Sequence, residues 1–336
     1  MKRYTIPHFG DYTIALKALI DPDAEFVITT PTHRTIELGV RHSPEFICYP
    51  YKIVLGNMIE NINLGATDLF MLDINASPFE AECRLAYYSL LQKMFLNEHK
   101  VAFHRLRIEK IVQSLKKELP DCSLFKIVNN IMLFALKTYL IDSLNTAYYR
   151  TISEGKKKVK DEILREIDMT NKAFGLLKVK KKIKKSFPQS KGRLRVAIIG
   201  EIYLIHETSI NNDIAGILND LGVEVDVLAN LSHFILYSFC KKRMIKKYAK
   251  TSKEYLDCAV GGHGLDSVAH MIESGKYAGI IQILPFGCMP ETSVRPILSK
   301  VASDKKINYL SLSLDQHAGK AGLETRLEAF VDMIRK

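Results

Sequence analysis

The chain has 336 residues, of which 47% are hydrophobic and 25% are charged. A chain of this length and apolar content is long enough to bury two hydrophobic cores, so we expect two domains. Its 48 lysines and arginines against 37 aspartates and glutamates leave a net charge of +11, which suits nucleic acid, an anionic membrane or an acidic small ligand equally well. Six cysteines without a pairwise spacing pattern do not describe the disulfide framework of a small secreted protein.

The N-terminal segment and the longest apolar region indicate whether the protein is secreted, spans a membrane or stays in the cytoplasm. Met1–Pro7 has no apolar run behind its charges, so it is typical of a first strand rather than a signal peptide, and we expect a cytoplasmic protein. The apolar region Ile127–Leu144 favours a buried helix over a membrane span. It is interrupted by four polar residues, Asn129, Asn130, Lys137 and Asp142.

The first part of the chain, residues 1–103, alternates short β-rich runs with helical patterns. Such alternation favours parallel βαβ units and predicts a first α/β lobe. The predicted strands are Tyr4–Ile6, Phe26–Thr29 and Leu69–Leu72, and the predicted helices are Tyr12–Leu19 and two that begin at Thr35 and Tyr51.

Residues 104–190 have mostly helical patterns, starting at His104, and are predicted to form a connector or insertion. This segment includes the lysine-rich run Lys178–Lys185, whose apolar residues recur at helical spacing. We interpret the run as the solvated face of a helix or a linker. Binding of nucleic acid or of a CoA phosphate is the alternative, but no stacking aromatics are interleaved with the lysines, so we expect no nucleic-acid site.

A second βαβ series occupies residues 191–336. Its predicted strands are Arg193–Ile199, Val223–Leu228, Gly279–Leu284 and Tyr309–Leu312, with a helix at Ile210–Leu221 and a closing helix from about Gly322 to Ile334. The predicted fold class is therefore α/β, with two flavodoxin- or Rossmann-like parallel-sheet lobes that face a cleft and a helical connector between them. Ligands of open parallel sheets bind beyond the carboxyl ends of the strands, so we expect the site in this cleft.

Two cysteines share a local setting. Cys48 and Cys288 each stand two residues before a proline, at the predicted start of a helix. Unpaired amides and the positive end of the helix dipole stabilise a thiolate or a negatively charged cluster there. Cys83 follows a turn-rich stretch and opens another predicted helix, although free cysteines also commonly fill cores. The remaining three are interpreted as structural: Cys122, Cys240 and Cys258.

Three further residues are candidates for chemistry. His263 lies in the run Gly261–Gly264, where it would donate a hydrogen bond to a ligand, or simply be a satisfied histidine in a helix-entry turn. Glu201 follows the first strand of the second series and is a candidate either for ligand contact or for helix capping. Glu291, just inside the helix after Cys288, is interpreted as complementing the helix dipole.

Several motifs together resemble one family, the activase-related CoA-enzyme group that is homologous to the cluster subunits of 2-hydroxyacyl-CoA dehydratases and to the double-cubane cluster proteins. The resemblance covers both α/β parts but not the helical connector. The motifs are Pro31–Gly39, Ser43–Pro50, Gly261–Gly264, Leu284–Glu291, Asp315–Gly319 and Thr325–Phe330.

The resemblance implies a [4Fe–4S] cluster ligated by Cys48, Cys83 and Cys288, with one iron left open. The sequence around Cys83 keeps the family's Cys-Arg and tyrosine pair but lacks the neighbouring Gly-Pro and Phe-Gly. The resemblance also implies low-potential electrons from an ATP-dependent activase of actin-like fold, and radical or reductive chemistry on a CoA thioester as a dehydratase-like lyase or reductase component. A homologous cluster subunit or a second copy is the further partner implied.

Two other functions stay open. One is a metal-free nucleotide- or CoA-binding module that acts as an accessory protein, although no Walker-type or Gly-x-Gly-x-x-Gly loop supports it. The other is a structural partner that has lost its cluster, which only the altered surroundings of Cys83 suggest.

Overall fold

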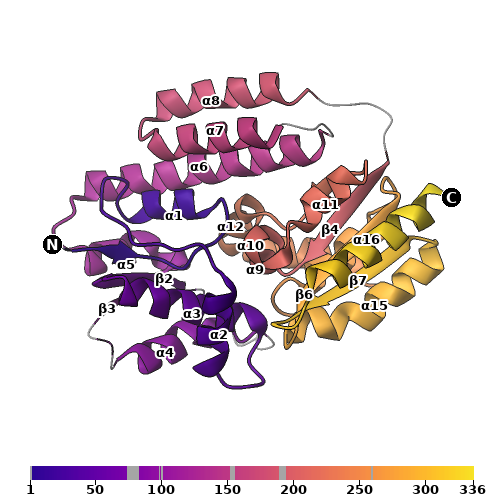
Figure 1. Cartoon of the computed structure of the whole chain (residues 1–336), viewed down its shortest axis with the longest axis horizontal. Helices are drawn as coiled ribbons and strands as arrows, with labels where there is room; N and C mark the ends of the chain where they lie inside the picture. The colour runs from indigo at the N-terminus through magenta and orange to yellow at the C-terminus, as the bar shows by residue number, and fades with distance from the viewer. Residues whose placement is uncertain are drawn as a thin grey trace.

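The computed structural model describes residues 2–73, 83–97, 99, 101–151, 156–188, 194–258 and 260–336. It has an α/β fold with two separate parallel sheets, which confirms the predicted fold class. Figure 1 shows the sheets at opposite sides of the molecule, with the long helices α6, α7 and α8 stacked along one edge.

The first sheet has the order β1-β2-β3. Its strands are Tyr4–Thr5 (β1), Asp68–Asp73 (β2) and Ala102–Arg107 (β3). The helices of this part are Thr13–Ile20 (α1), His33–Arg41 (α2), Tyr49–Asn63 (α3) and Leu85–Leu96 (α4). Leu69 and Phe70 of β2 point to opposite faces and enter two different apolar clusters, so helices cover both faces of the sheet.

Two sequence predictions in this part are wrong. Phe26–Thr29 is not a regular strand, because within it only Phe26 forms an isolated bridge, with Tyr4. The amide of Thr29 donates its hydrogen bond to the side-chain oxygen of Asn61 at 3.0 Å and not to a neighbouring strand. The helical segment does not begin at His104, because His104 to Arg107 pair with β2 and complete β3. The expected lobe boundary after residue 103 therefore falls inside a strand.

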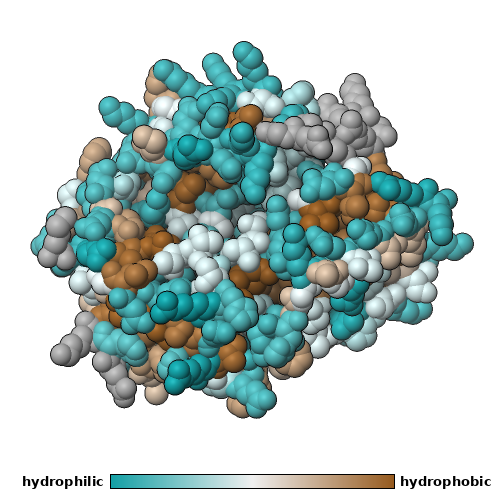
Figure 2. Space-filling view, in the orientation of Figure 1, coloured by the Kyte–Doolittle hydropathy of each residue, from teal (hydrophilic) through white to brown (hydrophobic). Residues whose placement is uncertain are grey.

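The helical segment follows β3. A 3-10 turn at Ile108–Lys110 leads into Ile111–Glu118 (α5), Leu124–Tyr149 (α6), Lys156–Met169 (α7) and Ala173–Ser186 (α8). On α8 the apolar residues Leu176, Val179 and Ile183 are buried while Lys181, Lys182, Lys184 and Lys185 are exposed, as predicted for a solvated helix face. Figure 2 shows hydrophilic residues over the top of this view, where α7 and α8 lie.

Helix α6 is, among the described helices, the one long and apolar enough to cross a membrane by length and composition, a property that core helices of soluble proteins share. Its Asn130 and Lys137 are buried, and both donate hydrogen bonds to backbone carbonyls, those of Ile20 and Asp168, at 2.9 Å. These contacts fit the predicted core helix.

The second sheet has the order β5-β4-β6-β7. Its strands are Arg195–Gly200 (β4), Glu224–Val227 (β5), Gly279–Pro285 (β6) and Asn308–Leu314 (β7). The helices around it are Ile202–His206 (α9), Thr208–Asn211 (α10), Ile214–Asp220 (α11), Leu231–Phe239 (α12), Lys241–Ser252 (α13), Gly264–Ile272 (α14), Met289–Lys305 (α15) and Lys320–Arg335 (α16).

The predicted helix Ile210–Leu221 is interrupted. Asn212 and Asp213 have φ of +57° and +53°, which ends α10, and the Asp213 carboxylate then accepts a hydrogen bond from the amide of Gly216 to begin α11. The apolar periodicity of this segment does not predict the break, because the break depends on the backbone conformation of Asn212 and Asp213 and on the N-cap hydrogen bond of Asp213.

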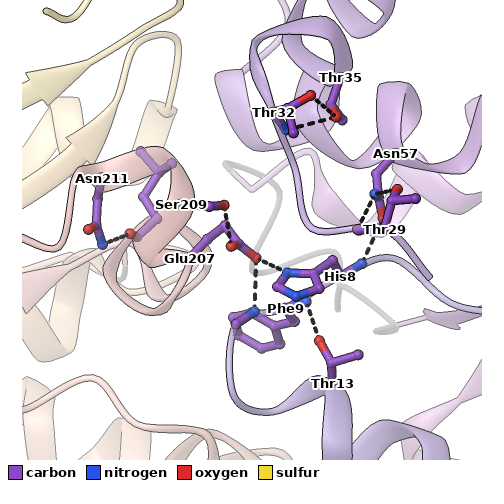
Figure 3. A network of polar contacts seen from close by, with 12 residues as sticks. His8, Phe9, Thr13, Thr29, Thr32, Thr35, Asn57, Glu207, Ser209 and Asn211 are labelled. Atoms are coloured by element: carbon purple, nitrogen blue, oxygen red, sulfur yellow. Dashed lines mark hydrogen bonds and ion pairs between the residues drawn. The ribbon is translucent and has the colours of Figure 1, made fainter. Parts of the chain in front are cut away.

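A buried carboxylate joins the two parts. Glu207, between α9 and α10, accepts hydrogen bonds from His8 Nδ1 at 2.7 Å, the amide of Gly10 at 2.8 Å and the hydroxyl of Ser209 at 2.6 Å. Figure 3 shows His8 in turn reaching Asn57 of α3 through its amide. The loop after β1 is thus pinned between the first lobe and the second.

Candidate functional site

Cys48, Cys83 and Cys288 line one cavity of about 100 Å³, although they come from three loops and two different sheets. The cavity lies beyond the carboxyl end of β6, where ligands of parallel sheets bind. The other cysteines lie elsewhere: Cys122 packs against the core of the first sheet, and Cys240 and Cys258 are exposed. The interpretation as a core-packing residue fits Cys122 but is wrong for Cys240 and Cys258, which are exposed on the surface instead of filling a core.

Two of the three cysteines stand at helix N-termini, as the Cys-x-Pro pattern predicts. Cys48 is the N-cap of α3 and Cys288 is the N-cap of α15, each in extended conformation with proline in the first turn. Proline is tolerated there because its missing N–H would be unpaired. The remaining amides and the partial positive charge of both helices face the cysteine loops and attract a negative group.

Glycines allow the loops to approach closely. Gly287 has φ of +77°, and a Cβ at this position would stand 3.3 Å from Cys48 Cα. Gly262 has φ of +58°, and its Cβ would stand 2.9 Å from Pro290 Cγ and 3.6 Å from Cys83 Cβ. A side chain at either position would push the loops that carry the cysteines apart.

Hydrogen bonds then hold the loops together. The amide of Tyr49 donates to the carbonyl of Phe286 at 3.2 Å, joining the starts of α3 and α15. Arg84, next to Cys83, donates from Nη2 to the carbonyl of Gly287 at 2.8 Å. Arg84 therefore ties the loop of Cys83 to the loop of Cys288.

The thiols are poorly solvated. Burial raises the pKa of Cys48 to about 11. The hydrogen bond with the hydroxyl of Tyr88, 2.6 Å from the Cys48 Sγ, lowers this pKa and so offsets part of the effect of burial. Burial also raises the pKa of Cys288, and the nearby carboxyls of Glu201 and Glu291 add to the effect. Without a cation both thiols hold their protons, and a bound metal would displace them.

Glu201 acts as a helix cap. Its carboxylate accepts hydrogen bonds from the amides of Tyr203 and Leu204, each at 2.9 Å, at the start of α9. This is the capping alternative of the sequence prediction. Glu201 also lines the cysteine cavity, so its carboxylate contributes to the electrostatic potential at the cysteines.

His263 lies at the N-cap of α14 and lines the same cavity. Its Nδ1 is 3.2 Å from the carboxylate of Asp266. Burial alone would lower the pKa of His263, but Asp266, Glu291 and Glu201 outweigh it and raise the pKa to about 9. The ring is held through Nδ1, which leaves Nε2 as its other possible donor.

Glu291 does more than complement the dipole of α15. It is 1% exposed, and its carboxylate accepts hydrogen bonds from Ser267 Oγ at 3.0 Å and Gln282 Nε2 at 2.7 Å. Burial raises its pKa to about 7. The sequence prediction of a dipole role alone missed this network, because Gln282 and Ser267 come from β6 and α14.

Tyr88 and Arg84 were not among the candidate residues. Both belong to the segment Cys83–Tyr88, and Arg84 and Tyr88 are four residues apart, a spacing that places two side chains on one face of a helix. That spacing is the signal in the sequence that would have selected them.

The three cysteines do not form a ready site for a single metal ion. Within the described ranges, no group of three or more His, Cys, Asp or Glu side chains could hold a metal ion. In a cubane each thiolate binds a different iron, so its ligands surround a larger object than one ion. The chemistry of the donors, three soft thiols that line one cavity, is of the kind that such a cluster uses.

The comparison with protein families agrees with these motifs. The family model described as 2-hydroxyglutaryl-CoA dehydratase, D-component, matches residues 14–334, nearly the whole chain. The chain belongs to this family. The expected relationship to 2-hydroxyacyl-CoA dehydratases is thereby confirmed, and membership as a D-component implies a partner component. No curated protein matches the chain.

Proposed function

We propose that this chain is the cluster-binding component of a dehydratase-like system, with Cys48, Cys83 and Cys288 as ligands of a [4Fe–4S] cluster. The observation that carries the proposal is the meeting of these three cysteines at one cavity. Chance burial would scatter residues that lie as far apart in the sequence as these.

When bound, such a cluster supplies one-electron chemistry and an open iron for a substrate oxygen. The chain's own residues would prepare the site for it. The N-termini of α3 and α15 favour its negative charge, and Tyr88 hydrogen-bonds the sulfur of Cys48. His263, fixed through Asp266, would offer its Nε2 as a donor to the substrate.

The electrons in this proposal come from an ATP-dependent activase of actin-like fold. Reduction of a cluster that has a very low potential needs coupling to ATP hydrolysis. The sequence contains no Walker-type loop to bind the phosphates of ATP, so a partner protein would hydrolyse the ATP. The reaction would be reduction or radical dehydration of a CoA thioester or a similar substrate. A homologous cluster subunit or a second copy of the chain is the partner component we propose.

The test is anaerobic reconstitution with iron and sulfide. The unchanged chain should gain the brown charge-transfer absorption of a thiolate-ligated cluster, and Cys288→Ser should lose it while circular dichroism shows an intact fold. Cys258→Ser, at an exposed cysteine, is the matched control and should keep the absorption. An unchanged spectrum in Cys288→Ser would remove the assignment, and the absence of iron from the unchanged chain would favour the metal-free CoA-binding alternative.

A further inference from the structure

A second cavity, of about 270 Å³, adjoins the cysteine cavity. We call it the apolar chamber. Its walls come from α1, α3, α4, β2, α6, α9 and α12, and they are formed largely by aliphatic and aromatic side chains. Six residues line both cavities: Pro50, Leu85, Tyr88, Glu201, Ile202 and Phe234. A molecule in the chamber would therefore reach the neighbourhood of the cysteines.

The chamber has the size of a small organic group. An apolar cavity of about 150 Å³ in another protein stays dry and binds benzene. A chamber of about 270 Å³ therefore has room for an aromatic ring with a few further carbons, or for a branched aliphatic chain. Its apolar walls give water few partners, so an apolar ligand would gain free energy by entering.

Two polar side chains in the wall, Gln92 and Tyr203, lack a hydrogen-bond partner among the described residues. Gln92 of α4 is 0% exposed, and neither its Nε2 nor its Oε1 has a hydrogen-bond partner among the described residues. Gln92 follows Tyr88 by one helical turn, so the face of α4 that touches Cys48 also presents the amide. A buried unpaired amide costs about 1–3 kcal/mol, and a ligand that bonds it recovers that cost. The hydroxyl of Tyr203, also in the wall, is likewise buried and without a partner in the described part of the chain.

The chamber is unsuited to an anion. No lysine or arginine occurs among the described residues that line it. The histidine among these described residues, His8, is already bonded to Glu207, and Glu201 adds negative charge. A side chain that ends in a carboxylate, such as the glutaryl group in the family's description, would be buried here without a counter-ion, which is costly.

We infer that the apolar chamber binds a neutral aliphatic or aromatic side chain that carries one hydrogen-bonding group, and that Gln92 pairs with that group. If the proposed function holds, the side chain belongs to the acyl part of a thioester whose reacting carbons lie at the cysteines. The binding itself does not need the cluster. The substrate class is then a neutral acyl thioester rather than a dicarboxylic one.

The test uses three probes of similar shape: toluene, p-cresol and p-toluate. Their dissociation constants for the full metal-free chain are measured by calorimetry or ligand-observed NMR. Toluene and p-cresol should bind, and p-toluate should bind at least about tenfold more weakly. Gln92→Leu should weaken p-cresol several-fold relative to toluene, since one hydrogen bond is lost. Gln113→Leu, at an exposed position of α5, is the matched control and should leave the ratio unchanged.

The place of binding is tested separately. The chain has no tryptophan, and Ala135 lies in the wall of the chamber but is exposed, so Ala135→Trp introduces a single reporter without disturbing the core. Its emission should change on addition of p-cresol, with the dissociation constant found for the unchanged chain. Binding without such a change, equal binding of p-toluate, or no binding of any probe would overturn the inference.

These outcomes are independent of the iron. If the probes bind with the expected selectivity but no cluster forms, the chamber stands and the proposed function fails. If a cluster forms and the probes do not bind, the proposed function stands and the substrate class is wrong.

Discussion

The sulfur of Cys48 lies 2.6 Å from the hydroxyl of Tyr88, which joins the N-terminus of α3 to the first turn of α4. Tyr88 is 4% exposed, and its ring packs edge to face against Tyr51 with the centroids 4.8 Å apart. One residue thus supports a candidate ligand with its hydroxyl and forms a wall of the apolar chamber with its ring.

Replacing Tyr88 by phenylalanine removes the hydroxyl but keeps the ring. We expect the free energy of unfolding of the metal-free chain, measured with urea, to fall by about 0.5–1.5 kcal/mol because one hydrogen bond is lost. The neighbouring Tyr87 is 58% exposed, so Tyr87→Phe is the control and should have almost no effect. Equal effects of the two changes would show that the Cys48–Tyr88 contact contributes nothing.

The close approach of the cysteine loops depends on Gly287. Gly287→Ala forces a side chain into a backbone with φ of +77° beside Cys48 Cα. We expect a loss of about 1–2 kcal/mol in the free energy of unfolding and a lower iron content after reconstitution. Gly275→Ala is the control, because no neighbouring atom outside its own chain segment lies within 4 Å of a Cβ there and its φ is not positive. An unchanged iron content in Gly287→Ala would contradict the role of this approach.

The Glu207 carboxylate is 1% exposed and accepts hydrogen bonds from three donors, so Glu207→Gln replaces an acceptor by a donor where acceptors are needed. Hydrogen bonds to a charged group contribute about 1.5–3 kcal/mol, and we expect a loss of this size in urea unfolding. Glu254→Gln, at an exposed site, should change stability by less than about 0.5 kcal/mol. A small effect at Glu207 would show that this contact does not hold the two parts together.

The lowered pKa of His206 predicts how the stability of the fold depends on pH. Burial lowers its pKa to about 4, and its Nε2 donates to the carbonyl of Ala229 at 2.7 Å. Below the unfolded pKa of about 6.5 the unfolded chain binds the additional proton, so stability is lost as pH falls from there toward 4. Between pH 6.5 and 5.5 the expected loss from this residue is about 1 kcal/mol.

The measurement is the urea midpoint at both pH values. His206→Gln should show a smaller difference between them than the unchanged chain does. His33→Gln, whose side chain is 82% exposed in the native protein, should keep the full difference. If His206→Gln keeps it as well, the histidine is not the group responsible.

Local features could be predicted from the sequence because their causes are local. The positions of Cys48 and Cys288 at helix starts follow from proline in the first turn, and the solvated face of α8 follows from the helical spacing of Leu176, Val179 and Ile183. The family motifs indicated the relationship to 2-hydroxyacyl-CoA dehydratases, and the family comparison confirms it.

The remaining features depend on partners that are distant in the sequence. Residues Ala102 to Arg107 carry three charged or polar side chains and no clear strand pattern, and they become β3 only because β2 offers its edge. The burial of Glu291 needs Gln282 from β6, and the apolar chamber needs walls from both lobes. Backbone conformation near a helix end is set by neighbouring residues, whereas burial and cavities are set by which surfaces meet in the folded chain, and that only the tertiary structure decides.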